Sequence, residues 1–397
     1  SAAVGSSVTA VTENSATSAL TVSGAVTVNG SGTTFTNSNA SGSSLLTVSG
    51  GVSGAGNVVL SNNSSIANGI TVSTGSLNNT GTVTNSGTGS GNSLVSSVVG
   101  TNVTGVVQNS ATSALAFTTS ANTYTSGLTI KSGTVSGAVA NSFGANANVI
   151  TIGDSAGSAN ATLSGAGAVT FANPISVASG NTGVAKITDT ANSTFSGAVT
   201  LNSHDLTLAP AANNLVLSGG VSGTGNLTIG TTGAGTTTLS TVSVNNAGTI
   251  TNNGTGAGLT TISGGVGSNV TAVTESSTTS ALTISTNALT VNGGGTTLTN
   301  SNTALMTVSG GVSGLGNLVL NNNSTTASGI TLSTTSVNNT GTITNSGSGS
   351  GSVLISAAVG SSVTAVTENS ATSALTVSGA VTVNGSGTTF TNSNASG

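Results

Sequence analysis

The sequence predicts an all-β protein that folds as a parallel β-helix, also called a β-solenoid. Apolar residues make up 35% of the chain, and in runs such as 20–22 and 70–72 they alternate with polar residues, which is typical of strands. No window between the frequent Gly, Asn and Ser residues has the composition or the 3.6-residue period of a helix. The chain also repeats at about 24 residues, the length of one solenoid coil. We therefore expect one continuous β-solenoid over residues 1–397, with roughly 16 rungs.

The chain carries very little charge. Its 397 residues include 2 Lys+Arg, 6 Asp+Glu and 1 His. Two lysines, Lys131 and Lys186, cannot form a basic face, so nucleic acid is excluded as a partner. No run approaches 18 apolar residues, so we expect no membrane insertion in this segment. The sequence has no cysteine, which excludes disulfides and thiolate metal sites.

The longest repeat is identical letter for letter. Residues 1–42 recur as residues 356–397, which defines a period of 355 residues. Within this period, segments related to VTAVTE follow four glycines at matching places, Gly5, Gly100, Gly267 and Gly360. The predicted modules are therefore 5–99, 100–266, 267–359 and 360–397, of which the second is longer and divergent and the last begins the next period.

Each shorter module divides further into rungs. Apolar residues that open strands recur at steps of 21 to 26 residues, and we expect them to lie above one another in the stack. In the first module they are Leu20, Leu46, Ile70, Leu94 and Leu115. In the third module and beyond they are Leu282, Met306, Ile330, Leu354 and Leu375. Met306 matches Leu46 and is expected to fill the core.

Other repeated positions predict the core and the turns. Phe35, Leu298 and Phe390 occupy equivalent places and are expected inside the coil. Asparagine pairs at 78–79, 245–246 and 338–339 also match, and we expect their side chains to form ladders along the stack. Such ladders would satisfy buried amides without charge.

The repeat also predicts self-association. Rungs spaced by about 4.8 Å would give the 355-residue period a rise of roughly 70 Å. Neither end of the sequence has a polar or helical cap of the kind that closes the strand edges of natural solenoids. We therefore expect either further 355-residue periods or copies stacked head to tail, and both arrangements produce a filament.

One stretch of the divergent module resembles a known family. Residues 122–135 have an Asn122-x-Tyr124 opening, then Gly127, Thr129 and Ile130, and a Gly133-x-Val135 close. This pattern resembles the autotransporter-associated β-strand repeat of bacterial passenger proteins, although Ser126 and Leu128 stand where the family more often has Gly and Thr. The resemblance covers about fourteen residues and occurs once. It implies a right-handed parallel β-helix on the outside of a Gram-negative-type cell, in an adhesin or giant surface protein.

We expect the carboxylate that recurs in the repeats to have a structural role and not a catalytic one. Glu13, Glu275 and Glu368 occupy the same repeat position, where the fourth copy has Gln108. A catalytic or metal-binding carboxylate would lose its role as an amide, whereas a hydrogen-bonding turn residue would not.

The other titratable residues lie in the divergent module and are Lys131, Asp154, Lys186, Asp189, His204 and Asp205. Polysaccharide cleavage needs carboxylates gathered on one face over adjacent rungs, and Asp189 and Asp205 are separated by less than a rung. His204 with Asp205 falls short of a metal coordination set. We therefore predict no catalytic, cofactor-binding or metal residues, no cofactor and no enzymatic activity.

Three functions remain open. The first is a structural subunit of an extracellular or cell-surface fibre built from tandem solenoid repeats. The second is an adhesin whose divergent module binds surface glycans. The third is ice binding through Thr-x-Thr arrays such as 34–36 and 82–84, although the repeats often replace these threonines with Ser, Asn or Gly.

Overall fold

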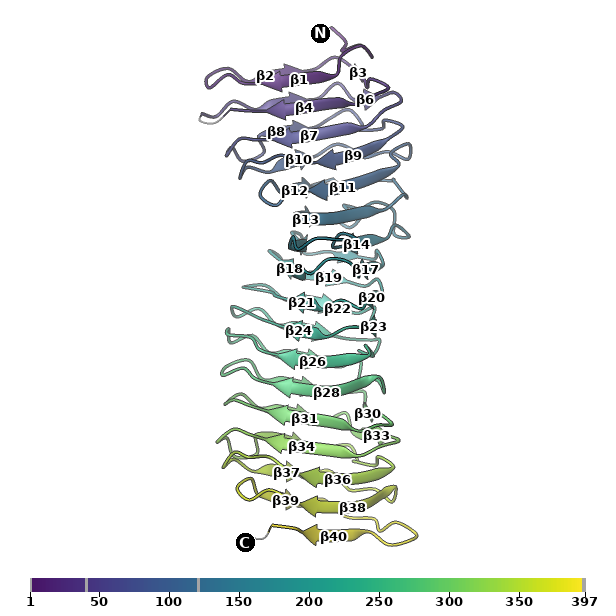
Figure 1. Ribbon diagram of the computed structural model, residues 1–397, viewed down its shortest axis with the longest axis vertical. Coiled ribbons are helices and arrows are strands. Elements are labelled where there is room, and N and C mark those ends of the chain that lie inside the picture. The colour runs from purple at the N-terminus through teal and green to yellow at the C-terminus, as the bar shows by residue number, and fades with distance from the viewer. Residues whose placement is uncertain (1, 40–41, 120–121, 395–397) are drawn as a thin grey trace. The chain divides into compact units, whose positions relative to one another are not determined.

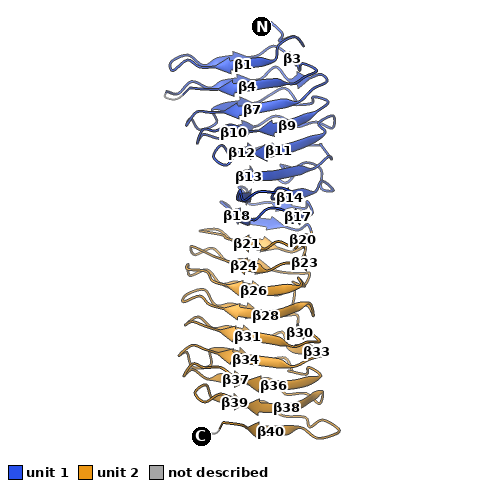
Figure 2. Cartoon of the chain, in the orientation of Figure 1, with its two compact units in different colours: residues 1–197 blue, residues 198–397 orange. Residues whose placement is uncertain are grey.

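The computed structural model describes residues 2–39, 42–119 and 122–394, and it contains 40 strands and no helix in these ranges (Figure 1). The chain divides into two compact units, residues 1–197 and 198–397 (Figure 2). Each unit is a stack of parallel strands, and together they have about 16 turns spaced about 23 residues apart. The predicted β-solenoid and its rung length are confirmed. The unit boundary lies inside the predicted divergent module.

Unit 1 has two broad parallel sheets and two short strand pairs. The first sheet contains β1 (Ala10–Glu13), β4 (Thr33–Asn37), β7 (Val58–Asn62), β9 (Thr82–Asn85), β11 (Gly105–Asn109), the first part of β13 (Leu128–Gly137), β14 (Ile150–Ile152) and β17 (Ile175–Val177). The second contains β2 (Leu20–Val22), β5 (Leu46–Val48), β8 (Ile70–Val72), β10 (Ser93–Val95), β12 (Leu115–Phe117), the rest of β13, β15 (Ala161–Gly165) and β18 (Ala185–Asp189). The short pairs are β3 (Val26–Thr27) with β6 (Val52–Ser53), and β16 (Thr170–Phe171) with β19 (Ser193–Phe195).

Unit 2 is built in the same way. Its first sheet contains β21 (Leu206–Leu208), β24 (Leu227–Ile229), β26 (Gly248–Asn252), β28 (Val270–Glu275), β31 (Thr296–Asn300), β34 (Leu318–Asn322), β36 (Gly341–Asn345), β38 (Val363–Glu368) and β40 (Thr389–Asn392). Its second contains β22 (Leu215–Leu217), β25 (Thr237–Leu239), β27 (Thr260–Ile262), β29 (Leu282–Ile284), β32 (Met306–Val308), β35 (Ile330–Leu332), β37 (Val353–Ile355) and β39 (Leu375–Val377). The short strands are β20 (Val199–Asn202) with β23 (Val221–Thr224), and β30 (Leu289–Val291) with β33 (Val312–Gly314).

Apolar residues on alternate positions fill the inside of each coil. The predicted column of Leu20, Leu46 and Ile70 is in register, and so is the column of Leu282, Met306 and Ile330. Met306 is fully buried, as predicted. In the divergent module, residues that have no counterpart in the other rungs also fill the core, as the fully buried Tyr124 does.

Two predicted column positions are wrong by one residue. Ser93, not Leu94, pairs with Ile70 and Leu115, and Val353, not Leu354, pairs with Ile330 and Leu375. The two leucines point outward and are half-buried. Ser93 can be buried because its hydroxyl donates to Asn85 Oδ1 at 2.9 Å, so the most apolar residue of the strand is not the one that faces inward.

Phe35, Leu298 and Phe390 share one repeat position that was expected inside the coil, and two of the three side chains are found there. Phe35 and Leu298 are fully buried, whereas Phe390 is 55% exposed. Phe35 pairs with residues on both sides, Val11 and Leu60, whereas Phe390 pairs with Val366 and no described strand pairs with the other edge of β40. The identical segments 1–42 and 356–397 include residues 1, 40–41 and 395–397, which lie outside the described residues.

The prediction of asparagine ladders at 78–79, 245–246 and 338–339 is wrong, both in the position of the columns and in the hydrogen bonds that the asparagines make. Asn79, Asn246 and Asn339 are buried, but each donates to a backbone carbonyl of the preceding rung, at 2.7–2.8 Å, rather than to another asparagine. One such pair per module is too few for a ladder, which needs a polar residue on every rung. The true columns lie at the carboxyl ends of the first-sheet strands. They are Glu13, Asn37 and Asn62 in unit 1, and Asn252, Glu275, Asn300 and Asn322 in unit 2.

Candidate functional site: a groove beside Lys186

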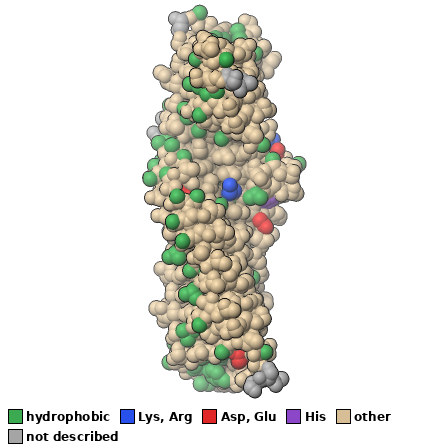
Figure 3. Space-filling view, turned by 90° about the vertical axis from the view of Figure 1, so that its left-hand side faces the viewer, with side chains coloured by type: hydrophobic (Ala, Val, Ile, Leu, Met, Phe, Trp, Pro, Cys, Tyr) green, Lys and Arg blue, Asp and Glu red, His purple; other side chains and the backbone are tan. Residues whose placement is uncertain are grey.

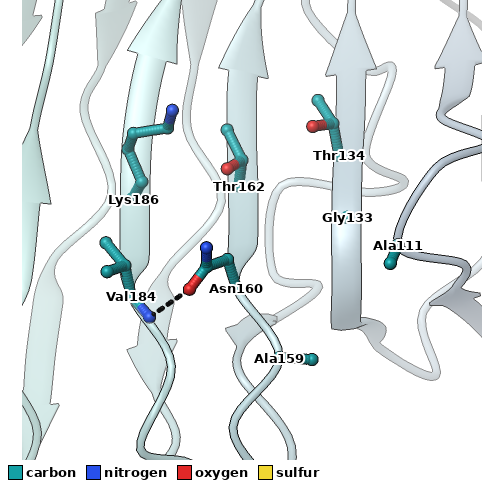
Figure 4. A pocket seen from close by; sticks show the side chains of 8 residues that line it. All are labelled: Ala111, Gly133, Thr134, Ala159, Asn160, Thr162, Val184 and Lys186. Carbon is teal, nitrogen blue, oxygen red and sulfur yellow. Dashed lines mark hydrogen bonds between the residues drawn. The ribbon is translucent and has the colours of Figure 1, made fainter.

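A groove of about 470 Å³ lies on the outer surface of unit 1 (Figure 4). It crosses the second part of β13 and the beginnings of the neighbouring strands β15 and β18. Thr134, Thr162 and Lys186 stand on these strands in register, side by side in the close-up. The remaining lining residues are Ala111, Gly133, Ala159, Asn160 and Val184.

The groove exists because one corner of the coil is missing. In neighbouring rungs, a loop of five or more residues joins the first sheet to the second, as in residues 110–114, 153–160 and 178–184. Strand β13 instead runs through this corner without a loop, and its register against β11 shifts between Ile130 and Ser132. The loops of the adjacent rungs therefore stand above β13 and form the walls, with Ala111 on one side and Ala159 on the other.

Glycine makes this corner possible. Gly133 has a φ of 76°, a conformation that residues with a side chain rarely adopt. A Cβ atom at Gly133 would lie 2.0 Å from the backbone oxygen of Ser110. Its N–H donates to the carbonyl of Asn160 at 2.8 Å, which ties the corner to the next rung. The segment that resembles the autotransporter repeat thus forms the floor of the groove.

Hydrogen-bonding groups without protein partners line the groove. The amide oxygen of Asn160 accepts from the backbone N–H of Val184 at 2.8 Å, which holds the side chain in place and leaves its NH₂ group available (Figure 4). No hydrogen bond is made by the hydroxyls of Thr134 and Thr162 within the described residues. Hydroxyls can both donate and accept, so this wall can hold polar ligands of either kind.

The two lysines differ in their surroundings. Lys131 Nζ lies 3.3 Å from Asp154 Oδ1, and the backbone N–H of Ser155 together with Lys131 lowers the pKa of Asp154. Lys186 has no ion pair or hydrogen bond within the described ranges. Charged side chains are few on the face drawn in Figure 3 and in the sequence as a whole, so the ammonium group of Lys186 has few charged side chains around it.

The remaining titratable residues of the divergent module differ in burial and in hydrogen bonding. Asp189 ends β18 in unit 1 and is 3% exposed; burial raises its pKa to about 6, while the backbone N–H of Ser193 opposes this shift. Asp205, in unit 2, is exposed and accepts from the backbone N–H of Asn226 at 2.8 Å. His204 Nδ1 lies 2.8 Å from the backbone oxygen of Asp205, not from its carboxylate. No three His, Asp or Glu side chains in the described part of the chain are arranged to hold a metal ion.

The repeated glutamates bind the turns that follow their strands. Glu275 accepts from the backbone N–H of Ser277 and from Asn252 Nδ2, both at 2.6 Å. Glu13 accepts from the N–H of Ser15 at 2.6 Å, and Glu368 from that of Ser370 at 2.7 Å.

Gln108, at the equivalent place, accepts from Asn85 and donates to the carbonyls of Ser110 and Ser113, each at 2.8 Å. An amide and a carboxylate are thus both satisfied here.

The Thr-x-Thr arrays are interrupted in the structure. Thr34, Thr36 and Thr84 are half-buried and point outward, but β7 lies between their strands and presents Val59 and Ser61 instead. The array is therefore not continuous from rung to rung on this sheet of unit 1.

The sequence did not single out Thr134, Asn160 or Thr162. The available signal was the missing corner: the fourteen-residue motif has no Asn or Ser turn cluster between Ile130 and Gly133, in contrast to the other rungs. Comparison with protein-family models, curated proteins and solved structures finds no match. Within the described residues, no helix has the length and apolar character needed to cross a membrane.

Proposed function

We propose that this chain is a structural subunit of an extracellular or cell-surface fibre of the passenger type, without enzymatic activity. The observation that carries the proposal is that the sequence of β4, a strand that is paired on both edges, recurs in β40. In unit 1, β4 pairs with β7 from Thr33↔Val58 to Asn37↔Asn62. Strand β40 presents the same residues as β4, so a segment with the sequence of β7 is complementary to its edge. A following 355-residue period would supply that segment, whereas a second copy would bring the free edge of its own β1 against β40.

Hydrogen bonding supports this proposal. Parallel pairing links strand to strand throughout each unit, and buried asparagines bond to backbone carbonyls at the turns. Interactions of this kind do not depend on ionised groups. A surface of Ser, Thr, Asn and Gly suits a fibre exposed to changing salt.

Electron microscopy of the 397-residue chain tests the proposal. Copies stacked head to tail would repeat every 397 residues, or about 16 turns, so we expect filaments with an axial repeat of roughly 77 Å. In β4, Thr33 donates to the following rung and Thr34 to the preceding one, so the Phe390 N–H of β40 faces the free edge. Phe390→Pro should therefore abolish filaments.

Phe390→Leu is the matched control, because Leu298 occupies the equivalent buried position, and it should assemble normally. Micrographs that show only monomeric particles, at any concentration, would contradict the fibre proposal.

The groove beside Lys186 favours a second candidate function, adhesion to surface glycans. It is a ligand-sized hollow lined by free hydroxyl, amide and ammonium groups. A fibre that carries this groove in every period would present many copies, and weak single contacts would add up to strong attachment.

A further inference from the structure

We propose that the groove beside Lys186 binds an acidic glycan segment, with the Lys186 ammonium holding a carboxylate or sulfate group. This inference rests on the adhesion function and names the class of ligand. Three features of the groove carry it: its size, the chemistry of its lining and the isolation of its one charge.

Size excludes a single inorganic anion as the natural occupant. The volume of about 470 Å³ lies in the range of roughly 300–1,000 Å³ that is typical of sites for organic ligands. The groove is open to solvent along the outer surface, so a ligand that continues beyond it on either side, such as a polysaccharide, can enter.

The lining is rich in donors and has no acidic side chain. Lys186 offers three N–H donors, Asn160 its free NH₂ group, and Thr134 and Thr162 one hydroxyl each. Donors of this number suit a ligand with many oxygen acceptors. Val184, which is 50% exposed, and the alanines supply apolar surface for the C–H faces of sugar rings.

The charge of Lys186 makes an acidic sugar the preferred ligand. Lys131, the other lysine, is paired with Asp154, so only Lys186 can offer an uncompensated cation within the described residues. A hydrogen bond from an ammonium to a carboxylate or sulfate is about twice as strong as one between neutral groups.

The site is also rigid. Thr134, Thr162 and Lys186 occupy matched positions on three hydrogen-bonded strands, about 4.8 Å apart from one strand to the next. The backbone beneath the binding groups is therefore already in place, and a ligand needs to order only side chains, chiefly that of Lys186, which limits the entropic cost of binding.

Titration calorimetry with three oligosaccharides tests the inference. The probes are an oligogalacturonate, a sulfated dextran oligomer and an uncharged dextran oligomer of similar length. We expect an acidic oligomer to bind and the uncharged one to bind at least about tenfold more weakly, with affinity falling as salt is raised. A preference for galacturonate or for sulfated dextran identifies the acidic group.

Three variants locate the site. Lys186→Met keeps the length of the side chain without its charge and should weaken acidic binding at least about tenfold, whereas Lys186→Arg should retain it. Lys131→Met is the matched control, because that lysine is paired outside the groove, and it should bind like the wild type.

The outcomes separate the proposals. Equal binding by wild type and Lys186→Met, or equal binding of charged and uncharged oligomers, overturns the acidic-glycan inference and leaves adhesion standing. Binding of none of the three oligomers overturns the inference at this groove, and a glycan array that also shows no ligand contradicts adhesion. The fibre proposal depends on neither result.

Discussion

At the scale of single residues, this protein replaces ion pairs with uncharged hydrogen bonds. Glu275 is an example, because its side chain is fully buried between Asn252 and Asn300 of the neighbouring rungs and has no cation beside it in the described residues. Burial raises its pKa from an ordinary value of 4.5 to about 7, while hydrogen bonds from Asn252 and Ser277 oppose this shift. The neutral form is thus favoured inside the coil.

This raised pKa predicts a pH dependence of stability. Below pH 4.5 Glu275 is protonated in both states, and the folded protein keeps its full stability. As pH rises from 4.5 to 7, the unfolded chain loses the proton first, so the free energy of unfolding falls by on the order of 3 kcal/mol. Glu275→Gln should remove this fall, because Gln108 is fully hydrogen-bonded at the equivalent place.

Urea denaturation of both proteins between pH 4 and pH 8 measures the effect. The variant should match the wild type at pH 4 and be more stable at pH 8. Gln108→Glu, the reciprocal change in unit 1, should introduce a new loss of stability above pH 5. Parallel pH profiles for Glu275→Gln and the wild type would refute the role of this carboxyl group.

At the scale of elements, the strands form a core that is similar on every rung, whereas the corners between them differ and shape the surface. Strands repeat the same inward positions on rung after rung, and exchange such as Phe35 for Leu298 leaves both side chains buried. The corners vary: most carry a loop, and β13 carries a glycine-dependent bend instead. That one departure produces the groove.

Substitution of Gly133 tests the bend. Gly133→Ala should destabilise unit 1 by well over 1 kcal/mol, because the left-handed backbone is strained and the new Cβ would meet the carbonyl of Ser110. Gly157→Ala is the matched control: its φ is 97°, but no atom lies within 4 Å of the added Cβ, so only the backbone term of about 1 kcal/mol applies.

Chemical denaturation monitored by circular dichroism compares the two alanine variants. Equal losses of stability would show that the close approach at Ser110 has no energetic weight. A larger loss for Gly133→Ala supports the bend as the origin of the groove.

At the scale of the whole molecule, the scarcity of charge is the dominant property. The chain has 2 Lys+Arg and 6 Asp+Glu, and the ion pair between Lys131 and Asp154 joins side chains that are 38% and 31% exposed. Such a surface pair contributes about 0–1 kcal/mol. Hydrophobic burial and backbone pairing therefore supply nearly all of the stability.

This composition predicts stability that is almost independent of salt. Between 0.05 and 0.5 M NaCl at pH 7, the thermal midpoint should shift by less than about 4 °C, because only about 1 kcal/mol of ion-pair energy can be screened. Differential scanning calorimetry measures the shift, and Lys131→Met should reduce it further. A change of ten degrees or more would show that electrostatic interactions hold the fold together.

The sequence by itself determined the all-β class, the stacking of rungs and most of the inward positions, because alternation and repeat length are local properties of the chain. Leu20, Leu46 and Ile70 stack as their spacing predicts. Where two or three adjacent residues are all apolar, as in Val353–Ile355, spacing cannot show which of them faces inward, and there the prediction was wrong by one.

Only the tertiary structure decided which polar residues meet. One example is the pair Asn252 and Glu275, and another is the row of Thr134, Thr162 and Lys186. Neighbouring members of each group are one full turn apart along the chain, so they lie side by side only because of the register between rungs. Register is set by the length of every intervening corner, and the shortened corner in β13 leaves a hollow beside the three residues that this register aligns. Neither composition nor period encodes that local change in path.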